Sequence, residues 1–151
     1  MPKIQESKKM QFSAKEIYDL VIDIEKYPEF LPWCSNSHIT KIINENQLHA
    51  DLVINFKSIY EKYTSDVIFK KISDEEFFVE ARAIKGPFKS LINQWKIIKI
   101  DNNHCLVNFY LEFEFNSLLL SKMLGAIFSS ATQKMMQAFE NRAIKLYKQH
   151  N

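Results

Sequence analysis

The sequence predicts an α+β protein in which helices cover one face of a single antiparallel sheet. Three observations support this fold class. Several central segments alternate apolar and polar residues and are separated by short polar turns, a capped helix follows the first strand, and a helical pattern without proline occupies residues 117–147. Because one long helix covers only part of a sheet face, we expect the sheet to curve around it and leave a cavity between them.

The first helix has a strong start signal after a polar strand at residues 4–12. Ser13 and Glu16 form a capping box, in which the serine hydroxyl accepts from the amide of Glu16 and the glutamate carboxylate reaches back to the amide of Ser13. Apolar residues then follow at helical spacing, at Ile17, Leu20, Val21 and Ile24. This pattern predicts a short helix with one face in the core.

Residues 23–34 predict a rigid, apolar-walled bend after that helix. Pro28 and Pro32 each fix their own φ and favour extended backbone in the preceding residue, and aromatic residues lie beside both. The segment holds no obvious acid, base or metal cluster. A stiff aromatic wall without a catalytic centre indicates binding of an apolar molecule.

The middle of the chain predicts the strands of the sheet. Residues 48–56, 77–83 and 107–115 alternate clearly, whereas residues 36–43, 58–71 and 91–100 are strand-like but do not show which side faces inward. Polar segments at 44–47, 73–76 and 101–104 predict hairpin turns.

The last predicted element is one helix from an N-cap at Ser117 to about Tyr147, roughly 45 Å long at 1.5 Å per residue. Its apolar stripe consists of Leu120, Leu124, Ile127, Phe128, Ala131, Met135, Ala138, Phe139, Ala143 and Leu146. The chain has 151 residues and no linker or repeat, so we expect one domain over residues 1–151.

The composition of the chain argues against several classes of function and indicates a cellular location. A net charge of +2 is too small to predict a DNA partner, and two glycines among 151 residues argue against phosphate-cradling loops. Cys34 and Cys105 form no C-x-x-C motif, which favours reduced thiols in the cytosol. The start lacks a signal sequence, and no apolar run approaches the ~18–20 residues of a membrane span. We therefore expect a cytoplasmic protein, with peripheral contact to the inner membrane as the alternative.

Catalytic patterns are lacking in the sequence. The four histidines have no metal-binding or triad-like spacing, and the carboxylate pairs lie on polar strand faces or in turns. We expect a binding protein without metal or cofactor, not an enzyme.

Three motifs carry a resemblance to a known family. They are Tyr-Pro-Glu-Phe-Leu-Pro-Trp-Cys at 27–34, Gly-Pro-Phe-Lys with Trp95 at 86–95, and Ala-Phe-Glu-Asn-Arg-Ala at 138–143 followed by Leu-Tyr at 146–147. In these motifs the chain resembles the coenzyme Q-binding START-like family, part of the helix-grip superfamily of lipid-transport and polyketide-cyclase-related domains. The resemblance implies a curved antiparallel sheet wrapped around a long C-terminal helix, with two short helices after the first strand.

The chain departs from this family at two places. Asn-Phe-Lys-Ser at 55–58 replaces the usual Gly-Phe-Lys-Gly, and Ser-Asp-Val at 65–67 replaces Ser-Arg-Val. The lost glycines predict a stiffer hairpin. The acidic Asp66 brings into question any docking role of the usual basic residue.

The resemblance implies two different functions, which the motifs do not separate. One branch binds ubiquinone as a ligand and supports respiration as a carrier or chaperone for the quinone. Another branch is a ribosome association toxin that binds the large subunit and blocks subunit joining. For the second branch the chain offers many lysines, but they are interleaved with carboxylates, as on an ordinary solvated surface.

If the chain binds a prenylquinone, the expected pocket lies between the sheet and the long helix. Candidate lining residues are Trp33, Phe56, Trp95, Phe113, Phe115, Leu124, Phe128 and Met135, and Lys89, Tyr60 or Tyr63 could donate a hydrogen bond to a quinone carbonyl. Ordinary core packing between a helix and a sheet would produce the same apolar pattern. Residues 87–88 and 118–120 are candidate apolar tips for membrane contact, or else buried loop anchors.

Overall fold

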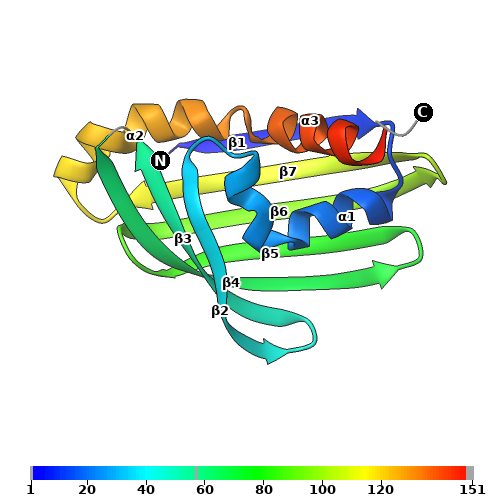
Figure 1. Cartoon of the computed structure of the whole chain (residues 1–151), viewed down its shortest axis with the longest axis horizontal. Helices are drawn as coiled ribbons and strands as arrows, with labels where there is room; N and C mark the ends of the chain where they lie inside the picture. Colours follow the sequence, from blue (N-terminus) through cyan, green and yellow to red (C-terminus); the bar gives the residue numbers. More distant parts are fainter. Residues whose placement is uncertain (1, 57, 149–151) are drawn as a thin grey trace.

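A computed structural model of the chain describes residues 2–56 and 58–148. It shows a seven-stranded antiparallel sheet with helices on one face (Figure 1). The elements in chain order are β1 (Lys3–Met10), α1 (Ala14–Ile22), the 3₁₀ helix η1 (Ile24–Glu29), β2 (Cys34–Asn44), β3 (Gln47–Phe56), β4 (Ile59–Ser73), β5 (Glu76–Lys85), β6 (Phe88–Asp101), β7 (His104–Phe115), α2 (Leu118–Thr132) and α3 (Met135–Tyr147). The predicted α+β class, the curved sheet and the two short helices after the first strand are confirmed.

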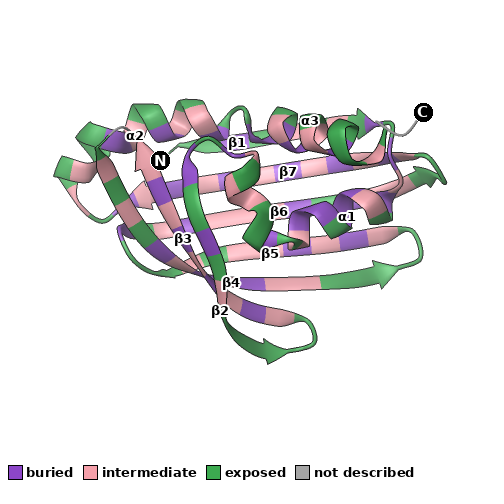
Figure 2. Ribbon diagram, viewed as in Figure 1, coloured by how far each residue is buried: buried purple, intermediate pink, exposed green. Residues whose placement is uncertain are grey.

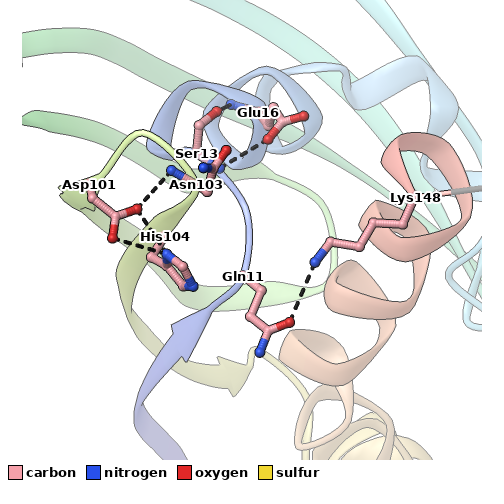
Figure 3. A network of polar contacts seen from close by, with 7 residues as sticks. All are labelled: Gln11, Ser13, Glu16, Asp101, Asn103, His104 and Lys148. Carbon is pink, nitrogen blue, oxygen red and sulfur yellow. Dashed lines mark hydrogen bonds and ion pairs between the residues drawn. The ribbon is translucent and has the colours of Figure 1, made fainter. Parts of the chain in front are cut away.

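Strands β2 to β7 form a meander in which each strand pairs with the next one. The three predicted hairpin turns are confirmed, because the pairs Asn44–Gln47, Ser73–Glu76 and Asp101–His104 close the corresponding hairpins. In the last of these turns the Asp101 carboxylate accepts from the Asn103 amide at 2.8 Å and lies 2.8 Å from Nδ1 of His104 (Figure 3). The first strand, β1, pairs antiparallel with β7 at one edge of the sheet, and β2 forms the other edge.

The capping box at the start of α1 is present as predicted. Ser13 Oγ accepts from the Glu16 amide at 3.1 Å, and the Ser13 amide donates to Glu16 Oε1 at 3.0 Å (Figure 3). Close by, Lys148 Nζ donates to Gln11 Oε1 at 3.5 Å. The end of the chain is thereby linked to the segment that leads into α1.

The bend after α1 is folded more tightly than the prolines alone predict. Tyr27 and Pro28 both lie in η1, whereas extended backbone was expected before each proline. The Tyr27 carbonyl accepts from the amides of Phe30 at 3.1 Å and Leu31 at 2.8 Å, and the Tyr27 ring packs edge-on against Phe139 of α3. These contacts stabilise a 3₁₀ turn, and the rigidity of the bend stays a prediction.

The C-terminal helix differs from the prediction because it is interrupted. The sequence predicts one helix to Tyr147, but α2 ends at Thr132 and α3 begins at Met135, with a turn at residues 133–134. The buried Thr132 hydroxyl donates to the carbonyls of Phe128 at 2.9 Å and Ser129 at 3.1 Å. Such side-chain bonding back to the preceding turn bends helices. Both helices nevertheless run along the same side of the sheet, which is why one apolar pattern continues through both (Figure 1).

The core lies between the sheet and the helices, and Figure 2 shows buried and partly buried positions alternating along the strands. In β7 the predicted inward residues Val107, Phe109, Leu111, Phe113 and Phe115 are all buried.

Both cysteines are buried and free, and burial raises the pKa of the Cys34 thiol to about 11 and that of the Cys105 thiol to about 12. At neutral pH both side chains are therefore protonated and behave as small apolar groups.

Candidate functional site

A small apolar cavity lies between the sheet and the helices, with a volume of about 50 Å³. The residues that surround it come from η1, the bend, the strands β3 to β7 and both C-terminal helices. They are Ile24, Tyr27, Trp33, Leu52, Tyr63, Ser65, Val67, Val79, Ala81, Leu91, Asn93, Trp95, Leu111, Phe128, Thr132 and Met135. We call this space the inner cavity.

Five of the predicted site residues line the inner cavity. They are Trp33 from the bend, Tyr63 from β4, Trp95 from β6, Phe128 from α2 and Met135 from α3. Trp95 also belongs to the core, because its ring packs against Phe109 and Phe139 at centroid distances of 4.9 and 4.7 Å. The structure therefore brings these residues together as predicted, and their role in binding stays a prediction.

Three other predicted residues lie elsewhere in the core. Phe113 and Phe115 of β7 and Leu124 of α2 are buried between the sheet and α2, outside the lining of the inner cavity. Phe113 and Phe115 pack on Phe128 at centroid distances of 4.8 and 6.0 Å, and Phe88 stacks on Phe115 at 4.8 Å. This aromatic cluster fills the end of the fold near the start of α2. Phe88 is thus a buried anchor and not an exposed apolar tip, whereas Leu118 and Leu119 are 83% and 66% exposed.

Two predicted polar contacts point away from the inner cavity. Tyr60 is 63% exposed. The inward residues of β4 are Tyr63, Ser65 and Val67, and Tyr60 lies on the other face of the strand because side chains alternate between the two faces. Lys89 pairs with Glu114 at 3.3 Å on the outside of the sheet, beside an irregularity in the pairing of β6 with β7. Tyr63 is the remaining candidate donor of the three.

Two polar groups at the cavity, Ser65 and Asn93, were not predicted from the sequence. Ser65 and Asn93 stand at inward positions of β4 and β6, where alternation would require apolar residues. Asn93 Oδ1 accepts from Trp95 Nε1 at 3.1 Å, whereas Ser65 Oγ is buried without a partner among the described residues. In the sequence, the available signal for these two residues was a polar side chain at a position where the alternating pattern of a strand places apolar ones.

The tyrosines near the cavity are neutral donors at physiological pH. Burial is the main cause that raises the pKa of Tyr63 and of Tyr27 well above the ordinary value of 10. The Tyr27 hydroxyl donates to the carbonyl of Val21. Tyr63 is thereby the tyrosine of the cavity wall best suited to donate to a ligand oxygen.

A second, larger space lies on the outside of the bend and the C-terminal helices. This outer groove has a volume of about 1080 Å³ and is lined by residues 29–33 of the bend, Asn55 and Phe56 at the end of β3, and one face each of α2 and α3. Phe56, predicted for the inner pocket, lines this groove. Trp33 and Met135 line both spaces and form the wall between them.

Arg142 connects the helix side of the outer groove to the bend. Its Nη2 donates to Glu29 Oε1 at 2.7 Å, and its guanidinium lies 5.3 Å from the centroid of the Phe30 ring. The hydrogen bond from Arg142 is the main cause that lowers the pKa of the Glu29 carboxyl. Two of the three sequence motifs therefore meet at this contact.

Both spaces offer apolar surface with a few polar side chains. Among residues 2–56 and 58–148, no three His, Cys, Asp or Glu side chains gather as metal ligands would. Within the same residues, no helix is long and apolar enough to cross a membrane. An apolar cavity with a few inward polar groups between a curved sheet and helices is the arrangement of a ligand-binding protein.

Residues 10–140 match the family described as polyketide cyclase / dehydrase and lipid transport, and the chain belongs to this family. It is 37% identical to the ribosome association toxin RatA of Rickettsia prowazekii over 150 residues, which covers 98% of this chain and 100% of that protein. It is 30% identical to the mitochondrial coenzyme Q-binding protein COQ10 of Dictyostelium discoideum over 96% of this chain and 70% of that protein. The solved structure of a START superfamily protein from Mycobacterium smegmatis shares the fold, with a TM-score of 0.75 at 16% identity and coverage of 95% of this chain and 98% of that chain.

Proposed function

We propose that this protein binds a polyprenylated quinone such as ubiquinone between the sheet and the C-terminal helices, and acts as a carrier or chaperone for it, not as an enzyme. The observation that carries the proposal is the inner cavity, where Tyr63 and Ser65 place two hydroxyl groups in a mostly apolar wall. Quinone carbonyls accept hydrogen bonds, and the Ser65 hydroxyl has no other partner among the described residues. The identity to a coenzyme Q-binding protein supports the same ligand class.

The driving force is the transfer of the prenyl tail from water. Each buried CH₂ contributes about 0.8 kcal/mol, so one five-carbon unit contributes roughly 3–4 kcal/mol. The inner cavity of about 50 Å³ is smaller than the ~150 Å³ that holds a benzene molecule. Binding a quinone ring therefore requires one wall to move outward.

Helix α2 is the wall best suited to move. Its side-chain hydrogen bonds among the described residues stay within the helix and its cap, at Ser117 and Thr132. The turn at residues 133–134 separates it from α3, so α2 can swing while α3 stays in place. The exposed Leu118 and Leu119 at its start would then contact a membrane from which the quinone is taken.

The test is solvent extraction of protein purified from a quinone-producing cell, followed by mass spectrometry. A near-stoichiometric prenylquinone is expected. Replacing Ser65 by alanine should weaken quinone binding about tenfold, because a hydrogen bond to the ligand is lost. Ser37→Ala is the matched control, since Ser37 Oγ is also buried without a partner among the described residues but lies outside the inner cavity. Folded protein that carries no quinone and takes up none would contradict the proposal.

A second candidate function is association with the large ribosomal subunit. The observation in its favour is the identity to RatA, which is higher than that to COQ10 and spans both chains almost completely. Sedimentation of the protein with separated ribosomal subunits tests this function. The experiment is repeated at high salt, because non-specific attraction between charges weakens as the salt concentration rises. Binding to the large subunit by protein that carries no quinone would place this function first. A cytoplasmic location with peripheral membrane contact is compatible with both proposals.

A further inference from the structure

The two halves of the outer groove differ in chemistry. Where α2 forms the wall, the lining is mostly apolar, with Ala126, Ile127 and Ala131 beside one hydroxyl, that of Ser130. Pro32 from the bend and Phe56 from β3 are further apolar lining residues. Where α3 and its N-cap form the wall, the lining is mostly polar, with Lys134, Gln137, Asn141, Arg142 and Lys145 beside the apolar Met135 and Ala138. A ligand that fills the groove must therefore be amphipathic.

The charge of the polar half favours an anion. The groove is lined by three cations, Lys134, Arg142 and Lys145, and by one carboxylate, Glu29, which gives a net charge of +2. Arg142 pairs with Glu29, while Lys134 and Lys145 make no ion pair within residues 2–56 and 58–148. A negative head group would neutralise cations that the described protein leaves unpaired.

Unpartnered polar atoms gather on the same residues. Five buried side-chain polar atoms lack a hydrogen-bond partner in the described structure, and three belong to residues of this groove: Trp33 Nε1, Asn55 Oδ1 and Arg142 Nε. Trp33 is 4% exposed and the Arg142 side chain 10% exposed. A buried donor without an acceptor destabilises the folded protein, because its lost hydrogen bond to water is not replaced. An anionic oxygen in the groove would supply the acceptor that Trp33 Nε1 and Arg142 Nε lack.

We propose that the outer groove binds an amphiphile with one anionic head group, a long-chain carboxylate or phosphate. The head lies in the α3 half beside Arg142, and the tail lies along the α2 half beside Phe56. This proposal does not rest on the quinone function, because its ligand is charged and its site lies outside the inner cavity.

The experiment is calorimetric titration of the folded protein with three ligands that share one tail: oleic acid, oleyl phosphate and oleyl alcohol. We expect saturable binding of the acid or the phosphate, and binding of the neutral alcohol at least about tenfold weaker, as the loss of one charge-assisted hydrogen bond implies. The tighter of the two anions identifies the head group. Alcohol binding as tight as anion binding, or no binding of any of the three, would overturn the proposal.

Arg142→Gln should weaken anion binding about tenfold or more. Arg82→Gln is the matched control, since Arg82 is the other arginine of the chain and pairs with Glu80 at 2.9 Å, away from the groove. If Arg142→Gln does not fold, Lys145→Glu replaces it, with Lys122→Glu as the control for charge alone. Equal affinity loss in variant and control would also overturn the proposal. A parallel titration with a neutral quinone shows separately whether the inner cavity binds its own ligand.

Discussion

The two C-terminal helices cover the same sheet but are held to it in different ways. Helix α3 makes polar contacts with three earlier parts of the chain: Glu140 with Lys8 at 2.6 Å, Arg142 with Glu29 at 2.7 Å, and the Tyr147 hydroxyl with the Glu16 carbonyl at 3.1 Å. Helix α2 packs through the apolar side chains of Leu124 and Phe128, and its side-chain hydrogen bonds among the described residues remain local. Directional contacts fix a position, whereas apolar packing tolerates displacement. We therefore expect α3 to stay in place and α2 to move more easily.

The largest expected effect comes from truncating the main aromatic residue of each helix. Phe139→Ala and Phe128→Ala should each lower the free energy of unfolding by about 3–5 kcal/mol, as measured by urea denaturation. Phe128 lines the inner cavity and Phe139 does not. Adding an apolar ligand should therefore restore part of the stability of Phe128→Ala only, because the new void opens onto the cavity. Equal recovery in both variants would contradict the distinction between the helices.

Amide hydrogen exchange measures the same difference in the unmodified protein. We expect amides of α2 to exchange at least about tenfold faster than those of α3, because α2 can separate from the sheet without breaking hydrogen bonds to other elements. Mass spectrometry of peptides from residues 118–132 and 135–147 provides the comparison. Added quinone should slow exchange in α2 and leave α3 nearly unchanged. Similar protection of both helices would rule out α2 as the moving wall.

The smallest expected effect concerns pH. Arg142 lowers the pKa of the Glu29 carboxyl below the ordinary value of 4.5, so the charged form contributes stability above pH 4.5. This contribution is lost as the pH falls through the lowered pKa. We expect exchange of α3 amides to increase in that acidic range, and Glu29→Gln to remove this part of the pH dependence. Because Glu29 is exposed, the change should be modest, and an unchanged acid profile in the variant would show that the pair does not fasten α3.

Local chemistry made most of the fold predictable. The capping box at Ser13, the three polar hairpin turns and the alternation in β3, β5 and β7 depend on neighbouring residues, and the structure has all of them. The break at residues 133–134 was not predictable, because the pattern of apolar residues continues across it. It depends on a buried threonine whose hydroxyl returns to the preceding turn.

The site was harder to predict because it depends on which way each strand faces. The sequence did not show which side of β4 and β6 faces inward, so Ser65 and Asn93 were not predicted and Tyr60 was expected at the cavity.

Gly86 shows how a distant residue sets the wall of the inner cavity. At its φ of +127° a Cβ atom would lie 2.7 Å from Cβ of Tyr63, so only glycine allows β4 to pass this closely. Nothing in the local pattern reveals such an approach.

The pairing of the first strand with the last one has a consequence for how the chain is made. From β2 to β7 each strand can pair with its predecessor as synthesis proceeds, because hairpin neighbours are adjacent in the chain. Strand β1 must wait, since its partners run from Cys105 to Glu112. Until that part of the nascent chain has left the ribosome, the N-terminal segment has no place in the sheet and β7 has no edge partner. Completion of this fold is therefore a late event in translation, because the pairing of β1 with β7 joins segments that are far apart in the chain.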